Sequence, residues 1–352
     1  SLDVSNNTVL EELNCSGSGL SKLNLGANSK LRKLECYHNY LTVLDMSGCS
    51  ALEALYCNNN RIKSLDLSHS RTLAELNCSV NNLTTLNVSD NKTLKTLDCH
   101  DNQLMSLNVP SCTVLEKLYC DKNQLASLEV SKNTALRSLG CNNNNLKALD
   151  VSRNLGLEML DCSGNKLKSL DVSKNTELKE LSCSSNQLET LNVSNCTALK
   201  SLFCTKNKLK TLDVSNNKTL EILNCSFNQL MSLDLSANRL LTEVECSSNQ
   251  LDTLNVTDCT ALKSLGCTNN KLKTLDIPDN TALVKLYCDE NRLEYLDVYG
   301  CERLLSLKYS GQTSDGTTPQ ILTLTMAEKQ KQKWITRWNN SNDTKDVKPE
   351  FK

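Results

Sequence analysis

The chain has 352 residues, a formal net charge of −1 and only 4% aromatic residues. This charge balance argues against a nucleic-acid partner held by bulk electrostatics, and no apolar run approaches the length that spans a membrane. Because aromatic residues are so few, leucine must supply most of the buried surface.

The sequence opens in the second half of a repeat, at Ser1–Ser5. We expect a trimmed or processed N-terminus, so the lack of a recognisable signal peptide says nothing about the compartment. From Cys15 to Cys288, fourteen cysteines follow one another at 21-residue intervals without an insertion. A fixed period of this length predicts one structural unit stacked many times. We place the repeat solenoid, of about 14–15 repeats, at residues 1–308.

The segment Leu178–Ala198, LKELSCSSNQLETLNVSNCTA, represents the repeat. Its first, fourth, sixth, eleventh, fourteenth and sixteenth positions are apolar in essentially every copy. Glu180–Cys183 alternates as a strand with one buried face does, and Thr190–Val193 alternates in the same way on the opposite wall. A single unit cannot bury its leucines without neighbours, and each buried Leu or Val contributes roughly 1.5–3 kcal/mol.

The 19 cysteines occupy two positions of the repeat. Fourteen stand at the sixth position, and five more lie on a second grid that otherwise carries mostly Asn: Cys49, Cys112, Cys196, Cys259 and Cys301. Side chains of in-register parallel strands point the same way, so pairing each with a neighbour would distort the ladder. We therefore predict buried free thiols. Disulfides and zinc are the alternatives, but no Cys-x-x-Cys pair occurs, and we predict no metal site.

Asparagine holds the ninth position in thirteen of fourteen copies, with Ser18 as the exception. A buried carboxamide there can satisfy backbone groups left unpaired by the bend after the strand; a polar binding ladder is the alternative. Asp or Asn at the fifteenth position, as at Asp45, is followed by Ser and is typical of turns. A calcium ladder is the alternative there, although the glycines of calcium-binding nonapeptide repeats are absent.

The pattern L-x-x-L-x-[LC]-x-x-N-x-L resembles the defining segment of leucine-rich repeats. The 21-residue form, with Cys at the sixth position and a nested L-x-x-L-D-V-S-x-N half, is similar to the cysteine-ladder repeats of bacterial surface proteins such as internalin J. The resemblance covers residues 1 to about 308. It implies a leucine-rich repeat horseshoe, with a parallel β-sheet on the concave face and short extended segments on the convex face. It further implies a secreted or cell-surface protein that acts by adhesion or protein binding.

The repeat pattern decays near Tyr309, which falls on the cysteine position. We predict a small α/β C-terminal cap at residues 309–340, with a short strand at Ile321–Leu324 and a helix at Met326–Trp338. The two tryptophans of this helix share one face and should cover the last coil; a partner-binding helix is the alternative. Residues 341–352 are expected to form a flexible tail, and the sequence leaves open a further domain beyond them.

The third, fifth, seventh and eighth positions flank the buried strand residues and should pave the concave face. Acidic residues outnumber lysines there by twelve to five. The candidate partner-binding residues are Tyr37, Tyr56, Asp98, Tyr119, Asp161, Phe203, Glu243, Glu245 and Tyr287. Exposed Tyr and Phe are typical anchors of protein interfaces, but Tyr also favours strands for its packing alone.

These residues support a monomeric module that binds a protein partner with basic patches. Carbohydrate binding is the alternative, with Tyr56, Tyr119, Phe203 and Tyr287 as stacking platforms; their spacing of three or four coils, roughly 14–20 Å, is wide for one short glycan. The three His residues form no Ser/His/Asp or Cys/His grouping. We therefore predict no catalytic residue and no cofactor.

Overall fold

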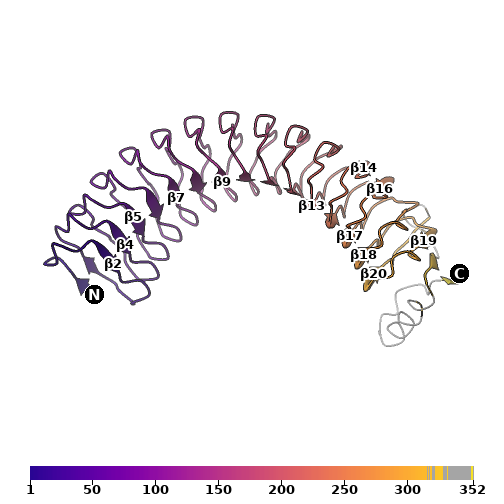
Figure 1. The fold of residues 1–352 in the computed structure, drawn as a ribbon, viewed down its shortest axis with the longest axis horizontal. Coiled ribbons are helices and arrows are strands. Elements are labelled where there is room, and N and C mark those ends of the chain that lie inside the picture. Colours follow the sequence, from indigo (N-terminus) through magenta and orange to yellow (C-terminus); the bar gives the residue numbers. More distant parts are fainter. Residues whose placement is uncertain (315, 317, 319–321, 328–330, 332–349, 352) are drawn as a thin grey trace. The chain divides into compact units, whose positions relative to one another are not determined.

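The computed structural model describes residues 1–314, 316, 318, 322–327, 331 and 350–351. The chain forms two compact units, Ser1–Leu178 and Lys179–Lys352. Each unit is a stack of coils, and each coil contributes one three-residue strand to a parallel ladder. Figure 1 shows that the ladder strands of each unit lie along the inner, concave side of its curve. The fold is a leucine-rich repeat solenoid, as predicted.

The ladder strands of unit 1 are β2 (Glu12–Asn14), β4 (Lys33–Glu35), β5 (Ala54–Tyr56), β6 (Glu75–Asn77), β7 (Thr96–Asp98), β8 (Lys117–Tyr119), β9 (Ser138–Gly140) and β10 (Met159–Asp161). Those of unit 2 are β11 (Glu180–Ser182), β12 (Ser201–Phe203), β13 (Ile222–Asn224), β15 (Glu243–Glu245), β17 (Ser264–Gly266), β18 (Lys285–Tyr287) and β20 (Ser306–Lys308). Within each unit, paired residues are 21 positions apart, as Leu97 and Leu118 are. The sequence period thus sets the register.

The opposite wall of the coils is extended but less regular. Short strands pair there in three places: β1 (Leu2–Asp3) with β3 (Leu23–Asn24), β14 (Ser232–Asp234) with β16 (Thr253–Asn255), and β19 (Tyr295–Asp297) with β21 (Thr323–Thr325) and β22 (Glu350–Phe351). A turn follows this wall, because the fifteenth residue accepts a backbone N–H two residues on. Asp66 Oδ1, for example, accepts from Ser68 N at 2.9 Å. The predicted turn role of this position is confirmed.

Leucine, valine and cysteine side chains fill the interior of the coils. All 19 cysteines are buried and carry free thiols, as predicted. Burial raises the pKa of thiols such as Cys57, Cys99 and Cys225 above the ordinary range. Thiols that stay protonated away from water are poor nucleophiles and poor metal ligands. They pack as small hydrophobes.

The ninth-position carboxamides form a fully bonded ladder. Asn60 Nδ2 donates to the carbonyl oxygens of Cys36 (2.9 Å) and Cys57 (3.1 Å), and its Oδ1 accepts from Leu41 N (3.0 Å). In the last coil Gln312 takes this place, with Oε1 accepting from Leu293 N at 2.9 Å. The carboxamide ladder therefore continues to Gln312. The sequence pattern missed this rung because Gln carries the same carboxamide on a longer side chain.

The second grid accepts either Asn or Cys because both side chains place a donor near the same two carbonyls of the preceding coil. Asn133 Nδ2 donates to the carbonyl oxygens of Val109 (2.9 Å) and Cys112 (2.8 Å). Cys112 Sγ lies 3.5 Å from the carbonyl oxygen of Val88 and 3.6 Å from that of Asn91, the equivalent acceptors one coil earlier. The Oδ1 atoms of the grid asparagines are buried and accept no hydrogen bond. This position therefore requires only a small hydrogen-bond donor for the two backbone carbonyls, and not the acceptor oxygen of a carboxamide.

The eighth residue of every coil adopts a left-handed backbone conformation, from Gly17 to Gly311. This conformation turns the chain away after the strand. Most coils place Gly, Asn, Asp, Ser or Lys there, whereas two place bulky residues, Val80 (φ 52°) and Phe227 (φ 55°). A left-handed backbone is unfavourable for bulky or β-branched side chains.

The C-terminal region contains β21, which overlaps the strand predicted at Ile321–Leu324. Within the segment predicted as a tail, Glu350–Phe351 forms β22 and pairs with β21. The predicted helix Met326–Trp338, with both tryptophans, lies largely outside the described residues. Among the described residues, no helix combines the length and apolar character needed to cross a bilayer.

Candidate functional site

The candidate residues lie on the strand faces of the two units, meaning the outward residues of the ladder strands and of the turns that follow them. The central residue of each ladder strand is Leu or Val and points inward, so its two neighbours point outward. Acidic residues outnumber lysines on the strand face of both units: seven to three in unit 1 and five to three in unit 2. The unit 2 count includes Lys308, the outward residue at the end of β20.

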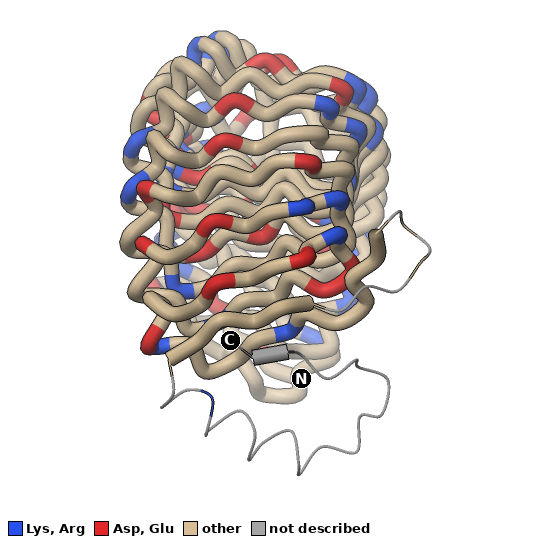
Figure 2. Tube along the Cα trace, turned by 90° about the vertical axis from the view of Figure 1, so that its right-hand side faces the viewer, with Lys and Arg blue, Asp and Glu red and all other residues tan. Residues whose placement is uncertain are grey.

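Opposite charge gathers on the flank that follows the turn, formed by the tenth to thirteenth residues of each coil. This flank carries six Lys or Arg and no acid in unit 1, and five Lys or Arg against three acids in unit 2. Figure 2 shows the Lys and Arg gathered toward the edges of the coils. The near-zero net charge of the chain therefore conceals two separate surfaces of opposite sign.

Asp98, Tyr119 and Asp161 stand in one row on the strand face of unit 1. Asp98 pairs in register with Tyr119, Tyr119 with Gly140, and Gly140 with Asp161. Asp98 Oδ1 lies 2.6 Å from His100 Nδ1, and this contact raises the pKa of the imidazole. The structure thus brings together three residues that the sequence predicted.

Asp121 lies beside this row, two residues after Tyr119, and was not among the candidate residues chosen from the sequence. A Cβ atom on Gly140 would lie 2.7 Å from Asp121 Oδ2 and 3.0 Å from Tyr119 Cδ1, so the carboxylate fills the space that glycine leaves. Asp121 Oδ1 accepts from Asn142 N at 2.9 Å, and Asn142 Nδ2 donates to Asp161 Oδ2 at 2.8 Å. Burial raises the pKa of Asp121 to about 6. No ion pair to Asp121 forms within the described part of the chain.

Tyr56 and Tyr37 lie further toward the N-terminus and have partners within the chain. The Tyr56 hydroxyl hydrogen-bonds Glu75, and Lys33 Nζ lies 5.9 Å from the Tyr56 ring centroid. Burial and this hydrogen bond raise the pKa of Tyr56 to about 12. Tyr37 packs edge-on against His38, with ring centroids 5.6 Å apart. These two residues are less available to a partner than Tyr119, whose ring has no cation over it in the described structure.

Phe203 is the exposed aromatic residue of the strand face in unit 2, with 37% of its surface accessible. Ile222 lies diagonally beside it, because Ile222 pairs with Ser201 and Asn224 pairs with Phe203. Phe227 follows in the next turn and is 54% exposed. Phe227 is not among the candidate residues chosen from the sequence, although the eighth position is expected to face outward as the fifth does.

Glu243, Glu245 and Tyr287 lie on strands that follow β13 toward the C-terminus. Glu245 pairs with Gly266, and Gly266 with Tyr287. A Cβ atom on Gly266 would collide with the Glu245 carboxylate, so this acid also folds over a glycine. Burial, together with the nearby Glu243, raises the pKa of Glu245. Tyr287 is covered by Lys308, whose Nζ lies 5.2 Å from the ring centroid.

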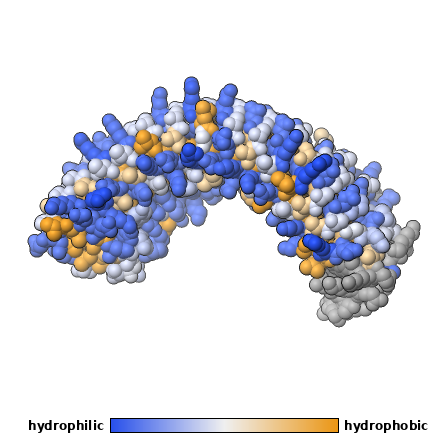
Figure 3. Space-filling view, in the orientation of Figure 1, coloured by the Kyte–Doolittle hydropathy of each residue, from blue (hydrophilic) through white to orange (hydrophobic). Residues whose placement is uncertain are grey.

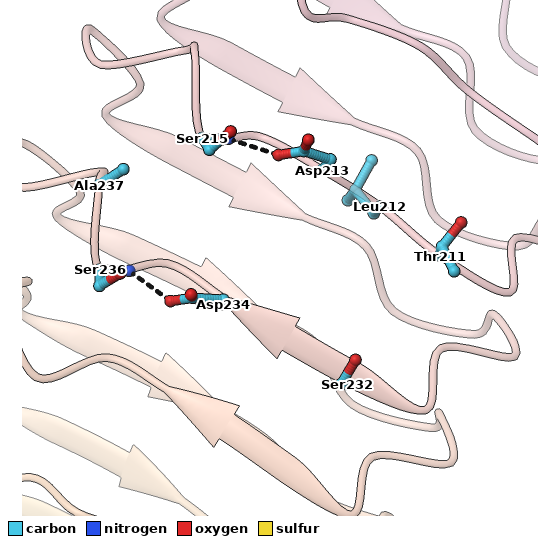
Figure 4. Close-up of a pocket in the computed structure, with 8 residues that line it drawn as sticks. All are labelled: Thr211, Leu212, Asp213, Ser215, Ser232, Asp234, Ser236 and Ala237. Carbon is cyan, nitrogen blue, oxygen red and sulfur yellow. Dashed lines mark hydrogen bonds between the residues drawn. The ribbon is translucent and has the colours of Figure 1, made fainter.

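A cavity of about 240 Å³ lies on the opposite wall of unit 2 (Figure 4). Asp213 and Asp234 line it, but each carboxylate already accepts a turn hydrogen bond, from Ser215 N (2.9 Å) and Ser236 N (3.0 Å). These bonds lower the pKa of both acids. Among the described residues, no three His, Cys, Asp or Glu side chains gather as metal ligands do. The cavity is accounted for by turn structure.

No protein-family model matches the sequence, and no curated protein sequence matches it either. Among solved structures, the functional domain of InlJ from Listeria monocytogenes, which includes a cysteine ladder, is 29% identical with a TM-score of 0.73. The match covers 90% of this chain and 73% of that one. YopM, a leucine-rich effector protein from Yersinia pestis, is 26% identical with a TM-score of 0.68, over 85% of this chain and 88% of its own.

A leucine-rich repeat protein of Leptospira interrogans is 20% identical with a TM-score of 0.69, over 99% of this chain and 97% of its own. At that identity the likeness concerns the fold alone. The functional domain of InlJ includes a cysteine ladder, and fourteen cysteines of this chain stand at one repeat position. The chain is a leucine-rich repeat protein with 21-residue cysteine-ladder repeats, similar to the internalin InlJ.

Proposed function

We propose that the chain is a non-catalytic binding and adhesion module that presents its strand faces to a protein partner. The main support for this proposal is the separation of charge. Acidic residues outnumber basic ones on the strand faces, whereas Lys and Arg outnumber acidic residues on the flank. A basic partner is attracted to the former and repelled by the latter, which orients it before contact. Exposed aromatic side chains such as Phe203 then supply contact area.

A secreted or cell-surface location at a bacterium is part of this proposal. Its support is the likeness to internalins of Listeria monocytogenes. Binding without catalysis is supported by the chemistry of the side chains, since the thiols are buried with raised pKa and His100 is held by Asp98. We propose that the module acts as a monomer.

Carbohydrate is the second candidate partner, because tyrosine rings can stack on sugars. The spacing opposes it: Tyr56 and Tyr119 are three coils apart and Phe203 and Tyr287 are four, roughly 14 and 19 Å at strand spacing. Two of the three tyrosines are also covered by a lysine of the chain. A protein partner is therefore favoured.

The proposal is tested by probing a microarray of purified extracellular proteins, and in parallel a glycan array, with the intact chain. Reversing two charges on the strand face, Glu243→Lys with Glu245→Lys, should weaken binding to protein hits by at least about tenfold and flatten its salt dependence. Reversing two charges on the flank of the same unit, Lys208→Glu with Lys210→Glu, is the matched control. Hits confined to glycans, or hits lost only with the flank variant, would contradict the proposal.

A further inference from the structure

An apolar patch with an acidic rim stands on the strand face of unit 2. On the face drawn in Figure 3, apolar residues lie in small groups among hydrophilic ones. The patch consists of Phe203 and Ile222, which lie diagonally on neighbouring strands, and Phe227 borders it in the turn that follows the strand of Ile222. Its rim consists of Glu180 on one side and of Glu243 and Glu245 on the other. The printed register fixes this order: Glu180 pairs with Ser201, Ser201 with Ile222, and Ile222 with Glu243. Apolar centres with polar rims are the common anatomy of protein interfaces.

Phe227 is the residue that packing within the chain does not explain. It holds a left-handed backbone (φ 55°) at a position where Asn269 and Ser248 adopt the same conformation in other coils, and it leaves 54% of its surface exposed. A bulky residue in this conformation is energetically unfavourable. Its contact with Lys206, whose Nζ is 5.9 Å from the ring centroid, is solvent-exposed and offsets little of that cost. Backbone strain of this kind accompanies ligand sites.

The rim has no cations of its own. Glu180, Glu243 and Glu245 form no ion pair among the described residues. Glu243 and Glu245 project from one three-residue strand and repel each other, which contributes to the raised pKa of Glu245. A cation brought by a partner would relieve that repulsion. Lys206, beside Phe227, would in contrast disfavour a cation over the centre of the patch.

The spacing of these groups fits an extended peptide laid along the stack. Glu180 and Glu243 are three coils apart, about 14 Å at a strand spacing of roughly 4.8 Å. An extended chain rises about 3.3 Å per residue, so residues i and i+4 span about 13 Å. Residues i, i+2 and i+4 of such a chain also face the same side. One face of the peptide can therefore place cations at both ends and an apolar side chain in the middle.

We propose that unit 2 binds an extended segment of its protein partner with the pattern cation–x–apolar–x–cation. The cations, Lys or Arg, pair with Glu180 at one end and with Glu243 and Glu245 at the other. The central side chain, Phe or a large aliphatic residue, packs on Phe203 and Ile222, and Phe227 borders the bound segment at the turn. This inference rests on the proposed protein-binding function and names the partner chemistry for one of its surfaces.

The test uses the full chain and a fluorescein-labelled peptide with the core Lys-Thr-Phe-Thr-Lys, measured by fluorescence polarisation. The matched control peptide, Lys-Phe-Thr-Thr-Lys, has the same composition and charge but turns its Phe to the other side of an extended chain. We expect the first peptide to bind at least tenfold more tightly than the control. Replacing both Lys by Glu should abolish binding.

Chain variants locate the site without disturbing the fold. Phe227→Asn and Phe203→Asn place at each position a residue that other coils carry there, Asn269 and Asn224 respectively. Together they should weaken peptide binding at least tenfold, and Glu243→Gln should weaken it several-fold. Tyr40→Asn on the flank of unit 1 is the control and should leave peptide affinity unchanged, because Tyr40 is exposed and Asn82 and Asn145 occupy the same position in other coils.

Equal affinity for the two peptides, no effect of the double Phe substitution, or no binding at about 1 mM peptide would each overturn the inference. The proposed function has a separate readout in the protein microarray. If protein hits still depend on the strand-face acids while the peptide results fail, the pattern is wrong and the binding function stands. If the array fails as well, both are wrong.

Discussion

At the scale of single residues, the left-handed eighth position shows which side chains fit the solenoid poorly. Val80 is β-branched and holds φ at 52°, where Asn59 and Asn143 occupy the same position in other coils. The local cost is not repaid by deep burial, because Val80 is only half-buried. Residue identity at this position is therefore a readable indicator of strain.

Val80→Asn should stabilise unit 1 by about 0.5–1 kcal/mol, because Asn tolerates the left-handed region and Val does not. Equilibrium urea unfolding measures the change. Val43→Asn is the control: Val43 is exposed and its backbone is not left-handed, so no gain is expected. A loss of stability in Val80→Asn would show that the packing of this side chain outweighs its strain.

Asp121 makes stability depend on pH in a direction unusual for a carboxylate. Its pKa rises from 3.8 to about 6 on folding, so between these values the folded state binds more protons than the unfolded state. Stability of the wild type should therefore fall as the pH rises from about 4 to 6, and the penalty should persist above that range. Asp121→Asn should remove it, adding on the order of 1–3 kcal/mol at pH 7 and nothing below pH 4.

Thermal unfolding from pH 3.5 to 8 tests this prediction. Asp150→Asn serves as the comparison, because the pKa of the exposed Asp150 is lowered by hydrogen bonds from Ser152. Its substitution should destabilise the chain at neutral pH, with an effect that shrinks on acidification. The same pH trend for both variants would mean that Asp121 is not held as the structure places it.

At the scale of repeated elements, the two asparagine columns differ in how completely they are bonded. Asn165 makes donor and acceptor bonds: Nδ2 reaches the carbonyl oxygens of Cys141 and Cys162, both at 3.0 Å, and Oδ1 accepts from Leu146 N at 3.0 Å. Asn154, on the second grid, uses only Nδ2, and its buried Oδ1 has no partner. Asparagines of the ninth position should therefore contribute more to the free energy of unfolding than those of the second grid.

Asn165→Ala should cost about 3 kcal/mol or more, since it leaves several buried backbone groups without partners. Asn154→Cys should change stability by less than about 1 kcal/mol, because a thiol can donate to the same carbonyls, as Cys112 does, and the unbonded oxygen disappears. Urea unfolding of both variants under reducing conditions gives the comparison. Similar losses would show that the second column needs the carboxamide after all.

At the scale of the whole molecule, the interior is a continuous dry layer within each unit. Cys99, Cys162 and Cys225 lie at the sixth position of their coils and have no accessible surface. In the native protein these thiols should resist a thiol reagent for hours, and in denaturant all 19 should react. Mass spectrometry after labelling identifies the modified residues. Rapid native labelling of any of the three would mean that the coil register is wrong.

The sequence by itself determined the solenoid, its register and the burial of leucine and cysteine. It could do so because each coil satisfies the same local rule, one apolar face every 21 residues, and the rule repeats without interruption. The 21-residue period also puts Asp98, Tyr119 and Asp161 in one row, because all three hold the fifth position of their coils. The last rung, Gln312, escaped the pattern because a different residue supplies the same carboxamide.

Only the tertiary structure decided which outward side chains act together. Asp121 folds over Gly140 because the neighbouring coil leaves space there, and Phe227 stays exposed on a left-handed turn where most coils carry Gly or a polar residue. Such placements depend on lateral neighbours and on backbone torsions at turns, neither of which is encoded in a one-dimensional period. The inward half of each coil follows from a repeated pattern, whereas the outward half follows from contacts between coils.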